Sequence, residues 1–419
     1  MTQMTDVESI RSVIAKLAAL PAPRPADAER LRTQFGSERL SELILIARLQ
    51  KKACLKFGPG VWWVTEKSLQ QATPWQIAKL KSQWLGDAKA YDLCCGIGGD
   101  AMQLALRASG TCQLVAVDSD PRVIEYADAN LQFITAKTLD NTGAAERTTT
   151  VCADARSIAI EAGASLHVDP DRRAGGKRTT RPEDYQPQLD DVMAMVGKAS
   201  SAIIKLAPAA ILPEPIQRSG HRCWMSLSGS VREQTVLLGE STERAGQQVG
   251  TVSAAVGRRD GAFSIFSADS QMLNAKAKPA NAPMAFLVDP DAAIRAAGLT
   301  ETFAETYSLR TLGGSAGFLT GDADFLTGDS GTLTEKMANI GQIAWAGSCD
   351  HRKLRKEFRK RNWYPETIKV RGTDHDPAKW VKQFRQCGET PVTLWIGRTG
   401  QRVFAAVSVK SAPAKQRIG

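Results

Sequence analysis

Four aspartates lie at or near the ends of apolar runs, and a carboxylate at the end of a buried strand can bind or orient a ligand. They are Asp92, Asp118, Asp154 and Asp169. In open α/β sheets the carboxyl ends of parallel strands meet at one edge, and ligands bind in the crevice there. We therefore expect these four carboxylates to line one site rather than to be scattered over a solvated surface.

A glycine-rich turn follows Asp92 and is the second chemical feature of this region. Gly96, Gly98 and Gly99 allow a tight backbone path that a bulky residue could not follow. Apolar residues resume at helical spacing from Met102. The stretch predicts strand, turn and helix, with bare backbone N–H groups brought up to a ligand.

Two of the acids have positions that fit a nucleotide-like cofactor. Asp118 lies about twenty residues beyond the glycine turn, the usual place for an acceptor of ribose hydroxyls. Asp154 ends the third expected strand and is well placed to meet an adenine amine. Both positions are predictions from spacing along the chain.

The turn by itself does not choose between two cofactors, because Gly96 to Ala101 also fits the G-x-G-x-x-A dinucleotide pattern. Two features favour S-adenosylmethionine. Asp92, inside the strand end, is placed to take the ligand's ammonium group. The sequence Asp169-Pro-Asp-Arg-Arg-Ala-Gly-Gly176 follows the fourth expected strand, where a methyl acceptor would be held.

The elements that must position these residues alternate between strand and helix. Strands are expected at 90–95, 113–118, 148–154, 165–171 and 202–207, and β-like runs at 222–227 and 262–266 could complete the sheet. This alternation predicts an α/β fold with a doubly wound, Rossmann-like parallel sheet. We expect a helical lobe at 1–85, the core at 86–270, a connecting segment at 271–340 and a small α+β domain at 341–419.

Composition excludes several classes of protein. The 419 residues are 43% hydrophobic and 23% charged, as in ordinary globular proteins. No stretch is long and apolar enough to span a membrane, and the polar start lacks the order of a signal peptide, so a cytoplasmic location is expected. The eight cysteines form no C-x-x-C pair and there are four histidines, so no metal site is expected.

The net charge of +10 is concentrated at one end of the chain. Residues 350–419 carry 17 Lys and Arg against 6 Asp and Glu, whereas the other 349 residues carry 37 against 38. Segregated charge of this kind favours a polyanion-binding module beside a neutral one, although a solvated surface helix is the alternative. A helix expected at 351–361 carries most of the cations: Arg352, Lys353, Arg355, Lys356, Arg359, Lys360 and Arg361.

Several of these motifs together resemble a known family. Lys56-Phe-Gly, Gln71-Ala-Thr-Pro, Asp92-Leu-Cys-Cys-Gly-Ile-Gly-Gly-Asp, Asp169-Pro-x-Arg-Arg and Phe318-Leu-Thr-Gly-Asp resemble bacterial class I S-adenosylmethionine-dependent methyltransferases with a C-terminal THUMP-like domain. The core also resembles the cap guanine-N2 (trimethylguanosine synthase) group.

The resemblance implies roles for individual residues. A cofactor site would be formed by Asp92, Gly96, Gly98, Gly99, Asp118 and Asp154. Asp169 and Pro170 would hold the acceptor, with Asp169 orienting it. Since THUMP-type domains bind RNA, the basic C-terminal module would bind RNA through phosphate contacts.

The chain departs from the amino-group methyltransferases at the acceptor motif. Asp171 and Arg172 replace the second proline and the aromatic residue that stacks the target base, which puts guanine-N2 chemistry in doubt. Arg172 could stack on a base or clamp a phosphate, and Arg173 follows in a basic loop. One of Trp62 and Trp63 could stack a base instead, since adjacent strand residues face opposite sides. Thr73 is expected to cap a helix that starts at Pro74.

The sequence therefore predicts a cytoplasmic S-adenosylmethionine-dependent methyltransferase that acts on a base in tRNA or rRNA. Three alternatives remain open: a methyltransferase for a small molecule or protein, a nucleic-acid-binding protein that has lost catalysis, and a dinucleotide oxidoreductase. The resemblance argues against the last of these.

Overall fold

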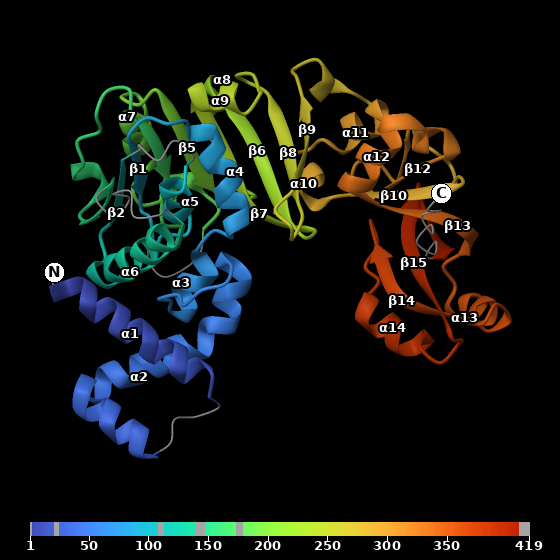
Figure 1. Cartoon of the computed structure of the whole chain (residues 1–419). Coiled ribbons are helices and arrows are strands. Elements are labelled where there is room, and N and C mark those ends of the chain that lie inside the picture. The colour runs from blue at the N-terminus through green and yellow to red at the C-terminus, as the bar shows by residue number, and fades with distance from the viewer. Residues whose placement is uncertain (1, 21–24, 108–112, 139–146, 173–178, 410–419) are drawn as a thin grey trace, which may run out of the picture. The chain divides into compact units, whose positions relative to one another are not determined.

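The computed structural model describes residues 2–20, 25–107, 113–138, 147–172 and 179–409. The chain divides into two compact units (Figure 1). The first comprises Met1–Arg222, Glu233–Gly250 and Arg259–Gly261, and the second comprises Cys223–Arg232, Thr251–Arg258 and Ala262–Gly419. In these described ranges, no helix has both the length and the apolar surface needed to cross a bilayer. The cytoplasmic location stays a prediction.

Helices form the N-terminal part of the first unit, as the sequence predicted. They are α1 (Thr2–Ala18), α2 (Pro25–Phe57), α3 (Glu66–Gln71) and α4 (Trp75–Leu85). Gly36 interrupts α2 with a φ of 78°. Gln50 of α2 ties the lobe to the segment that follows, because its side chain accepts from Trp62 N at 2.9 Å and donates to Trp62 O at 2.7 Å.

A nine-stranded sheet has the order β3-β2-β1-β4-β5-β7-β6-β8-β9. Its strands are β1 (Ala90–Leu93), β2 (Leu114–Asp118), β3 (Thr148–Cys152), β4 (Ser165–Val168), β5 (Ser201–Leu206), β6 (His221–Leu227), β7 (Ser230–Gly239), β8 (Val252–Gly257) and β9 (Phe263–Ala268). The first five run parallel. The chain proceeds outward from β1 to β3 and then returns to β4, so the strand order reverses between β1 and β4. This is the point where doubly wound sheets bind ligands. The predicted α/β, doubly wound fold is confirmed.

Two strands of this sheet were missed by the sequence analysis. β7 pairs antiparallel with β5, and β8 pairs antiparallel with β9. Among the helices of this part of the chain are α5 (Ala101–Ala105), α6 (Pro121–Thr138), α7 (Leu189–Val196), α8 (Glu214–Ser219) and α9 (Glu240–Arg244).

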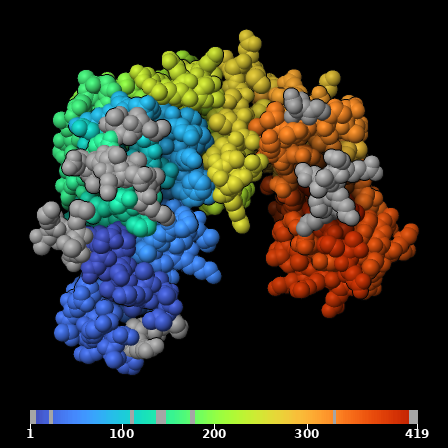
Figure 2. Space-filling view, in the orientation of Figure 1, coloured from blue at the N-terminus to red at the C-terminus, as the bar shows by residue number. Residues whose placement is uncertain are grey.

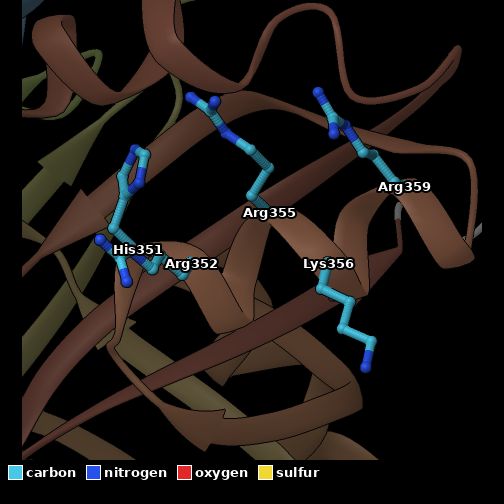
Figure 3. Close-up of a pocket in the computed structure, with 5 residues that line it drawn as sticks. All are labelled: His351, Arg352, Arg355, Lys356 and Arg359. Atoms are coloured by element: carbon cyan, nitrogen blue, oxygen red, sulfur yellow. The ribbon is translucent and has the colours of Figure 1, made fainter.

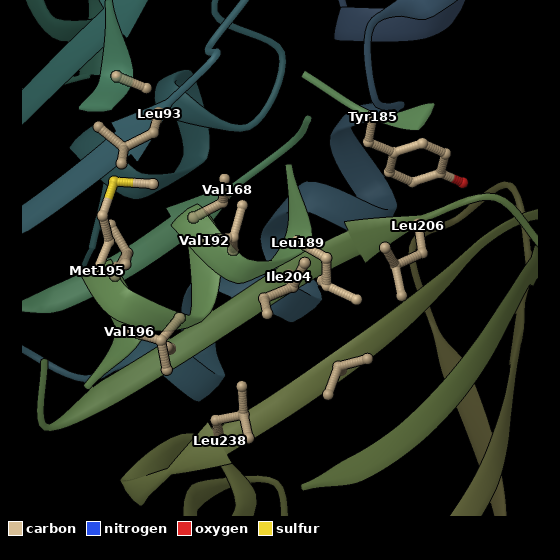
Figure 4. Close-up of a cluster of buried hydrophobic side chains, with 14 of the residues drawn as sticks. Leu93, Val168, Tyr185, Leu189, Val192, Met195, Val196, Ile204, Leu206 and Leu238 are labelled. Carbon is tan, nitrogen blue, oxygen red and sulfur yellow. The ribbon is translucent and has the colours of Figure 1, made fainter. Parts of the chain in front are cut away.

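A hydrophobic core holds the carboxyl ends of the central strands in place (Figure 4). Leu93 of β1, Val168 of β4 and Ile204 of β5 are at most 1% exposed, and α7 covers them with Val192 and other apolar side chains. Each fully buried side chain of this size stabilises the fold by roughly 1.5–3 kcal/mol. The ends of β1 and β4, where the predicted site lies, are therefore set on a rigid base.

The second unit contains a seven-stranded sheet of order β11-β12-β10-β13-β16-β15-β14. Its strands are β10 (Phe286–Pro290), β11 (Arg310–Leu312), β12 (Phe318–Gly321), β13 (Ala338–Ser348), β14 (Trp363–Val370), β15 (Thr390–Thr399) and β16 (Arg402–Val409). The helices α10 (Ala292–Ala296), α11 (Thr300–Thr306), α12 (Gly328–Met337), α13 (His351–Lys360) and α14 (Pro377–Phe384) accompany it. β15 and β16 pair antiparallel and form the terminal hairpin.

The expected boundary at 340/341 falls inside β13. This strand pairs with β10 on one side and with β16 on the other, so the expected connecting segment contributes strands to the same sheet as the basic C-terminal module. The part of Figure 2 coloured orange and red shows these elements as one closely packed body. Asp289 of β10 also binds Lys369 and Arg371 at 3.3 and 3.0 Å. The basic C-terminal module therefore has no separate beginning at residue 341.

Candidate functional site

The glycine turn leaves β1 through backbone conformations that favour glycine. Gly96 and Gly98 have φ of 58° and 86°. A Cβ added to Gly96 would meet nothing within 4 Å, so open space lies beside this backbone. The two amides are not bare, however: Gly96 N donates to Asp118 at 2.9 Å and Gly98 N donates to Cys95 O at 3.0 Å. Hydrogen bonds within this region thus fix the turn, and its backbone at Gly96 borders open space.

At position 99 a glycine is required by close packing rather than by backbone conformation. A Cβ there would lie 2.9 Å from Thr73 N and 3.2 Å from Ala72 Cβ. Only a residue without a side chain lets the 72–73 backbone pack this closely against the turn. The structure shows that Gly99 packs against the backbone of residues 72–73. The role predicted for Gly99 in cofactor binding stays a prediction.

Asp118 and Asp154 follow adjacent strands but have different surroundings. Asp118 ends β2, half-buried, and burial raises the pKa of its carboxyl group. Asp154 lies just beyond β3, is exposed, and pairs with Arg156 at 2.6 Å, which lowers the pKa of Asp154 to about 2. Asp118 is therefore fixed against the glycine turn, whereas Asp154 is held by its own loop.

Asp92 belongs to a buried network of charges that sequence reasoning missed. Its Oδ1 lies 2.7 Å from His167 Nδ1, and His167 Nε2 lies 3.1 Å from Lys81 Nζ. Lys81 in turn pairs with Asp100 and Glu233, each at 2.8 Å. Burial raises the pKa of Asp92. Asp92 Oδ2 has no hydrogen-bond partner within the described part of the chain.

A second branch of this network reaches the acceptor motif. Asp169 follows β4 and its Oδ2 lies 2.6 Å from the Nζ of Lys205, a lysine near the carboxyl end of β5. Lys205 also donates to Thr73 Oγ1 at 2.9 Å, and Thr73 donates to Asp100 at 2.5 Å. Burial alone would raise the pKa of Asp100, but Lys81 and the other cations lower it well below its ordinary value. Asp100 therefore remains a carboxylate.

The sequence offered a signal for these missed residues. A lysine in Ser201-Ala-Ile-Ile-Lys-Leu206 and a histidine in Ser165-Leu-His-Val168 interrupt otherwise apolar strands. A charged or polar side chain in such a strand is costly to bury unless it has partners. The interruption predicts a partner, but it does not say which one.

Two predictions about nearby residues are wrong. Thr73 does not cap α4, which has Pro74 at its N-cap without a side-chain bond; the Thr73 hydroxyl is used by Asp100 and Lys205 instead. Trp62 and Trp63 are each 1% exposed, so neither can stack a substrate base. Trp62 packs edge-on against Phe133, and Trp63 against Tyr126.

Pro170, directly after Asp169, is buried, and Arg172, two residues further along the chain, is partly buried. Arg172 Nη1 is a buried atom without a hydrogen-bond partner among the residues described. Arg173 lies outside the described residues. The roles predicted for Pro170, Arg172 and Arg173 stay predictions.

The basic helix α13 starts as predicted, at His351, with Asp350 as its N-cap. Leu354 and Phe358 form the buried face of α13, so most of the cations lie on its exposed face. A pocket of about 440 Å³ opens on the helix, lined by His351, Arg352, Arg355, Lys356 and Arg359. Figure 3 shows Arg355 and Arg359 extending from the same side of the helix and Lys356 from another. Lys353 and Lys360 are exposed on the same helix.

In the described ranges, no group of three or more His, Cys, Asp or Glu side chains is arranged to hold a metal ion. The site contains a network of carboxylates, lysines and hydroxyls. Its elements are the ends of β1, β2, β4 and β5 together with the Thr73 segment.

Comparisons with known proteins agree with this architecture. Two relatives from Mycobacterium tuberculosis, strains CDC 1551 and H37Rv, are described as uncharacterized S-adenosylmethionine-dependent methyltransferases. Each is 25% identical over 392 residues, which cover 88% of this chain and 96% of the relative. No family model matches the chain.

A solved structure shows the same fold over nearly the whole chain. It is a provisionally named methyltransferase from Porphyromonas gingivalis W83, 16% identical, with a TM-score of 0.68, covering 96% of this chain and 99% of that one. The relatives confirm the predicted class of enzyme, an S-adenosylmethionine-dependent methyltransferase, and the solved structure confirms the Rossmann-like methyltransferase fold. The THUMP-like domain and the likeness to the guanine-N2 group remain predictions.

Proposed function

We propose that this chain transfers the methyl group of S-adenosylmethionine to a base in an RNA, a tRNA or an rRNA, which α13 helps to hold. One observation carries the proposal: the glycine turn, Asp118 and Asp169 meet at adjacent strand ends where the sheet order reverses. A cofactor and an acceptor bound there would lie next to each other.

The residues present fit S-adenosylmethionine. The open space beside Gly96 leaves room for a ligand against the backbone. Asp118 has lone pairs left after accepting from Gly96 and Asp120, and these suit ribose hydroxyls. The unpaired Oδ2 of Asp92 suits the ammonium group. Asp154, at the neighbouring strand end, suits the adenine amine.

The chemistry asks little of the protein beyond position. The bound cofactor supplies an already activated methyl group. Asp169 accepts hydrogen bonds from the acceptor and turns its lone pair toward the reaction centre. Alignment of this kind can account for a large part of a rate enhancement. The chain needs no strong general base for it.

The RNA part of the proposal is supported by the charge of α13. Its outward cations face solvent at the pocket, and Arg355 Nε and His351 Nε2 are buried atoms without a partner among the described residues. Guanidinium groups bind phosphates in a bidentate geometry. A phosphate of the RNA backbone suits this pocket. THUMP-type domains, which the C-terminal module resembles, bind RNA.

The decisive experiment is labelled-methyl transfer to total RNA from cells that lack the protein, followed by nucleoside analysis. A labelled nucleoside supports the proposal and identifies the base. Label found only in protein or in small molecules would replace RNA with that acceptor. No transfer to any fraction, despite S-adenosylmethionine binding, would favour a binding protein without catalysis.

RNA binding is tested separately with Arg355→Ala/Arg359→Ala. The log–log salt slope of RNA affinity should fall by about 0.7–0.9 for every phosphate that is no longer neutralised. The matched control is Arg218→Ala/Arg244→Ala, which removes two exposed arginines of the first unit. Point variants are used because a truncation at 341 would cut β13. Equal slopes for the two double variants would count against the role of α13.

A further inference from the structure

Lys205 is a buried cation in a strand where every other residue is apolar or small. All six residues of β5 are buried, and Lys205 is 5% exposed between Ile204 and Leu206. Removing an ammonium group from water costs several kcal/mol unless partners compensate for it. A lysine at this buried position of β5 therefore needs partners that compensate for its charge.

The partners of Lys205 come from three separate parts of the chain. Its Nζ lies 2.6 Å from Asp169 Oδ2, 2.9 Å from Thr73 Oγ1 and 4.0 Å from Asp100 Oδ2. Burial lowers the pKa of Lys205, but the charges of Asp169 and the other acids outweigh it and raise the pKa overall. The lysine therefore stays protonated and donates to the oxygen atoms of Asp169 and Thr73.

We propose that Lys205 is the positioning residue of the acceptor site: it fixes Asp169 through one carboxylate oxygen so that the other receives the acceptor. The proposal rests on the proposed function. Asp169 Oδ2 is bound to Lys205, whereas no partner of Oδ1 is found among the described residues. The Asp169 side chain is 27% exposed and that of Lys205 only 6%, so the carboxylate presents a free side to the site.

The same lysine connects the acceptor carboxylate to the cofactor side. Thr73 accepts from Lys205 and donates to Asp100, the residue that follows the glycine turn. Asp100 is held again by Lys81 at 2.8 Å. One rigid set of hydrogen bonds thus fixes both the turn and Asp169. A shift of about 1 Å in such a frame can cost roughly 10²-fold in rate.

A purely structural ion pair makes a different prediction. Replacing one partner of a buried pair would then change only stability, and would lower it, because the other charge is left buried without compensation; only the replacement of both partners by apolar residues can be neutral. A positioning residue changes the rate through Asp169. Lys205→Met and Asp169→Asn should therefore share one kinetic signature, and their effects should not add.

The test measures labelled-methyl transfer to RNA from cells that lack the protein. Lys205→Met should lower kcat about 10²-fold and leave S-adenosylmethionine affinity within about threefold. The double variant Lys205→Met/Asp169→Asn should be no slower than Asp169→Asn alone. Thr73→Val, which removes only the hydroxyl, should give a smaller loss of the same kind. It serves as the second variant where Lys205→Met does not fold.

Lys198→Met is the matched control, because Lys198 is exposed beyond the end of α7 and belongs to none of the hydrogen bonds or ion pairs described for the site. It should transfer methyl groups like the wild type. Full activity of Lys205→Met, or strictly additive losses in the double variant, would overturn the positioning role while leaving the proposed function intact. A wild-type chain that methylates no RNA would overturn the proposed function, and this inference with it.

Discussion

Gly99→Ala tests whether the glycine turn is locked against the Thr73 segment. The added Cβ would lie 2.9 Å from Thr73 N, 3.2 Å from Ala72 Cβ and 3.2 Å from Thr73 O. Two of these neighbours are backbone atoms, which cannot move aside by rotating a side chain. Thr73 is also bonded to Asp100 and Lys205, so it cannot retreat without straining those bonds.

The expected cost follows from this crowding. Overpacking of a well-packed site destabilises by about 1–3 kcal/mol. In a domain of 150–250 residues each kcal/mol lowers Tm by about 2–4 °C, so Gly99→Ala should lose about 5 °C. Thermal unfolding followed by circular dichroism, with urea titration for the free energy, gives both quantities.

Gly197→Ala is the matched control in the same unit. A Cβ there would make only ordinary contacts at 3.7 Å, with Met193 O and Ala194 O, and the residue has a helical φ of −59°. Because alanine restricts the unfolded chain, this variant should gain about 0.4–1 kcal/mol. If Gly99→Ala were as stable as Gly197→Ala, the close packing of the turn against the Thr73 segment would be refuted.

Three further predictions concern the cofactor site and the second unit. Asp118→Asn should raise the Kd for S-adenosylmethionine about tenfold, since the amide nitrogen cannot accept from ribose hydroxyls; calorimetry measures it, and the exposed Asp154→Asn should change it less. Gly96→Ala should also weaken binding by filling the open space, at a cost of about 1–2 kcal/mol in stability for its left-handed φ. Asp289→Asn should cost about 2 kcal/mol at neutral pH by leaving three cations unpaired. Burial raises the pKa of Asp289, but its cations lower it overall below the ordinary 3.8, so this contribution is present above pH 3.8 and lost below it. The stability gap between Asp289→Asn and wild type should therefore close in acid, and a gap unchanged at low pH would contradict the ion cluster.

The sequence by itself determined the local order of the site. Apolar runs ending in acids predicted β1 to β4, an apolar run alone predicted β5, and the glycines predicted the turn, because these signals depend only on neighbouring residues. The basic helix α13 was predicted in the same way. Sequence also predicted the class of cofactor, from Asp92 and the Asp169-Pro170 motif.

Only the tertiary structure decided which groups meet. Thr73, Asp169 and Lys205 lie far apart along the chain and come together because β4 and β5 pair and the Thr73 segment packs on Gly99. The insertion of β7 between β5 and β6 likewise depends on pairing, not on local pattern. Thr73 was predicted to cap a helix because it directly precedes Pro74. In the structure its hydroxyl instead accepts from buried Lys205 and donates to buried Asp100. Burial also removed both tryptophans from the surface. Partners of this kind are set by long-range packing, which no local pattern records.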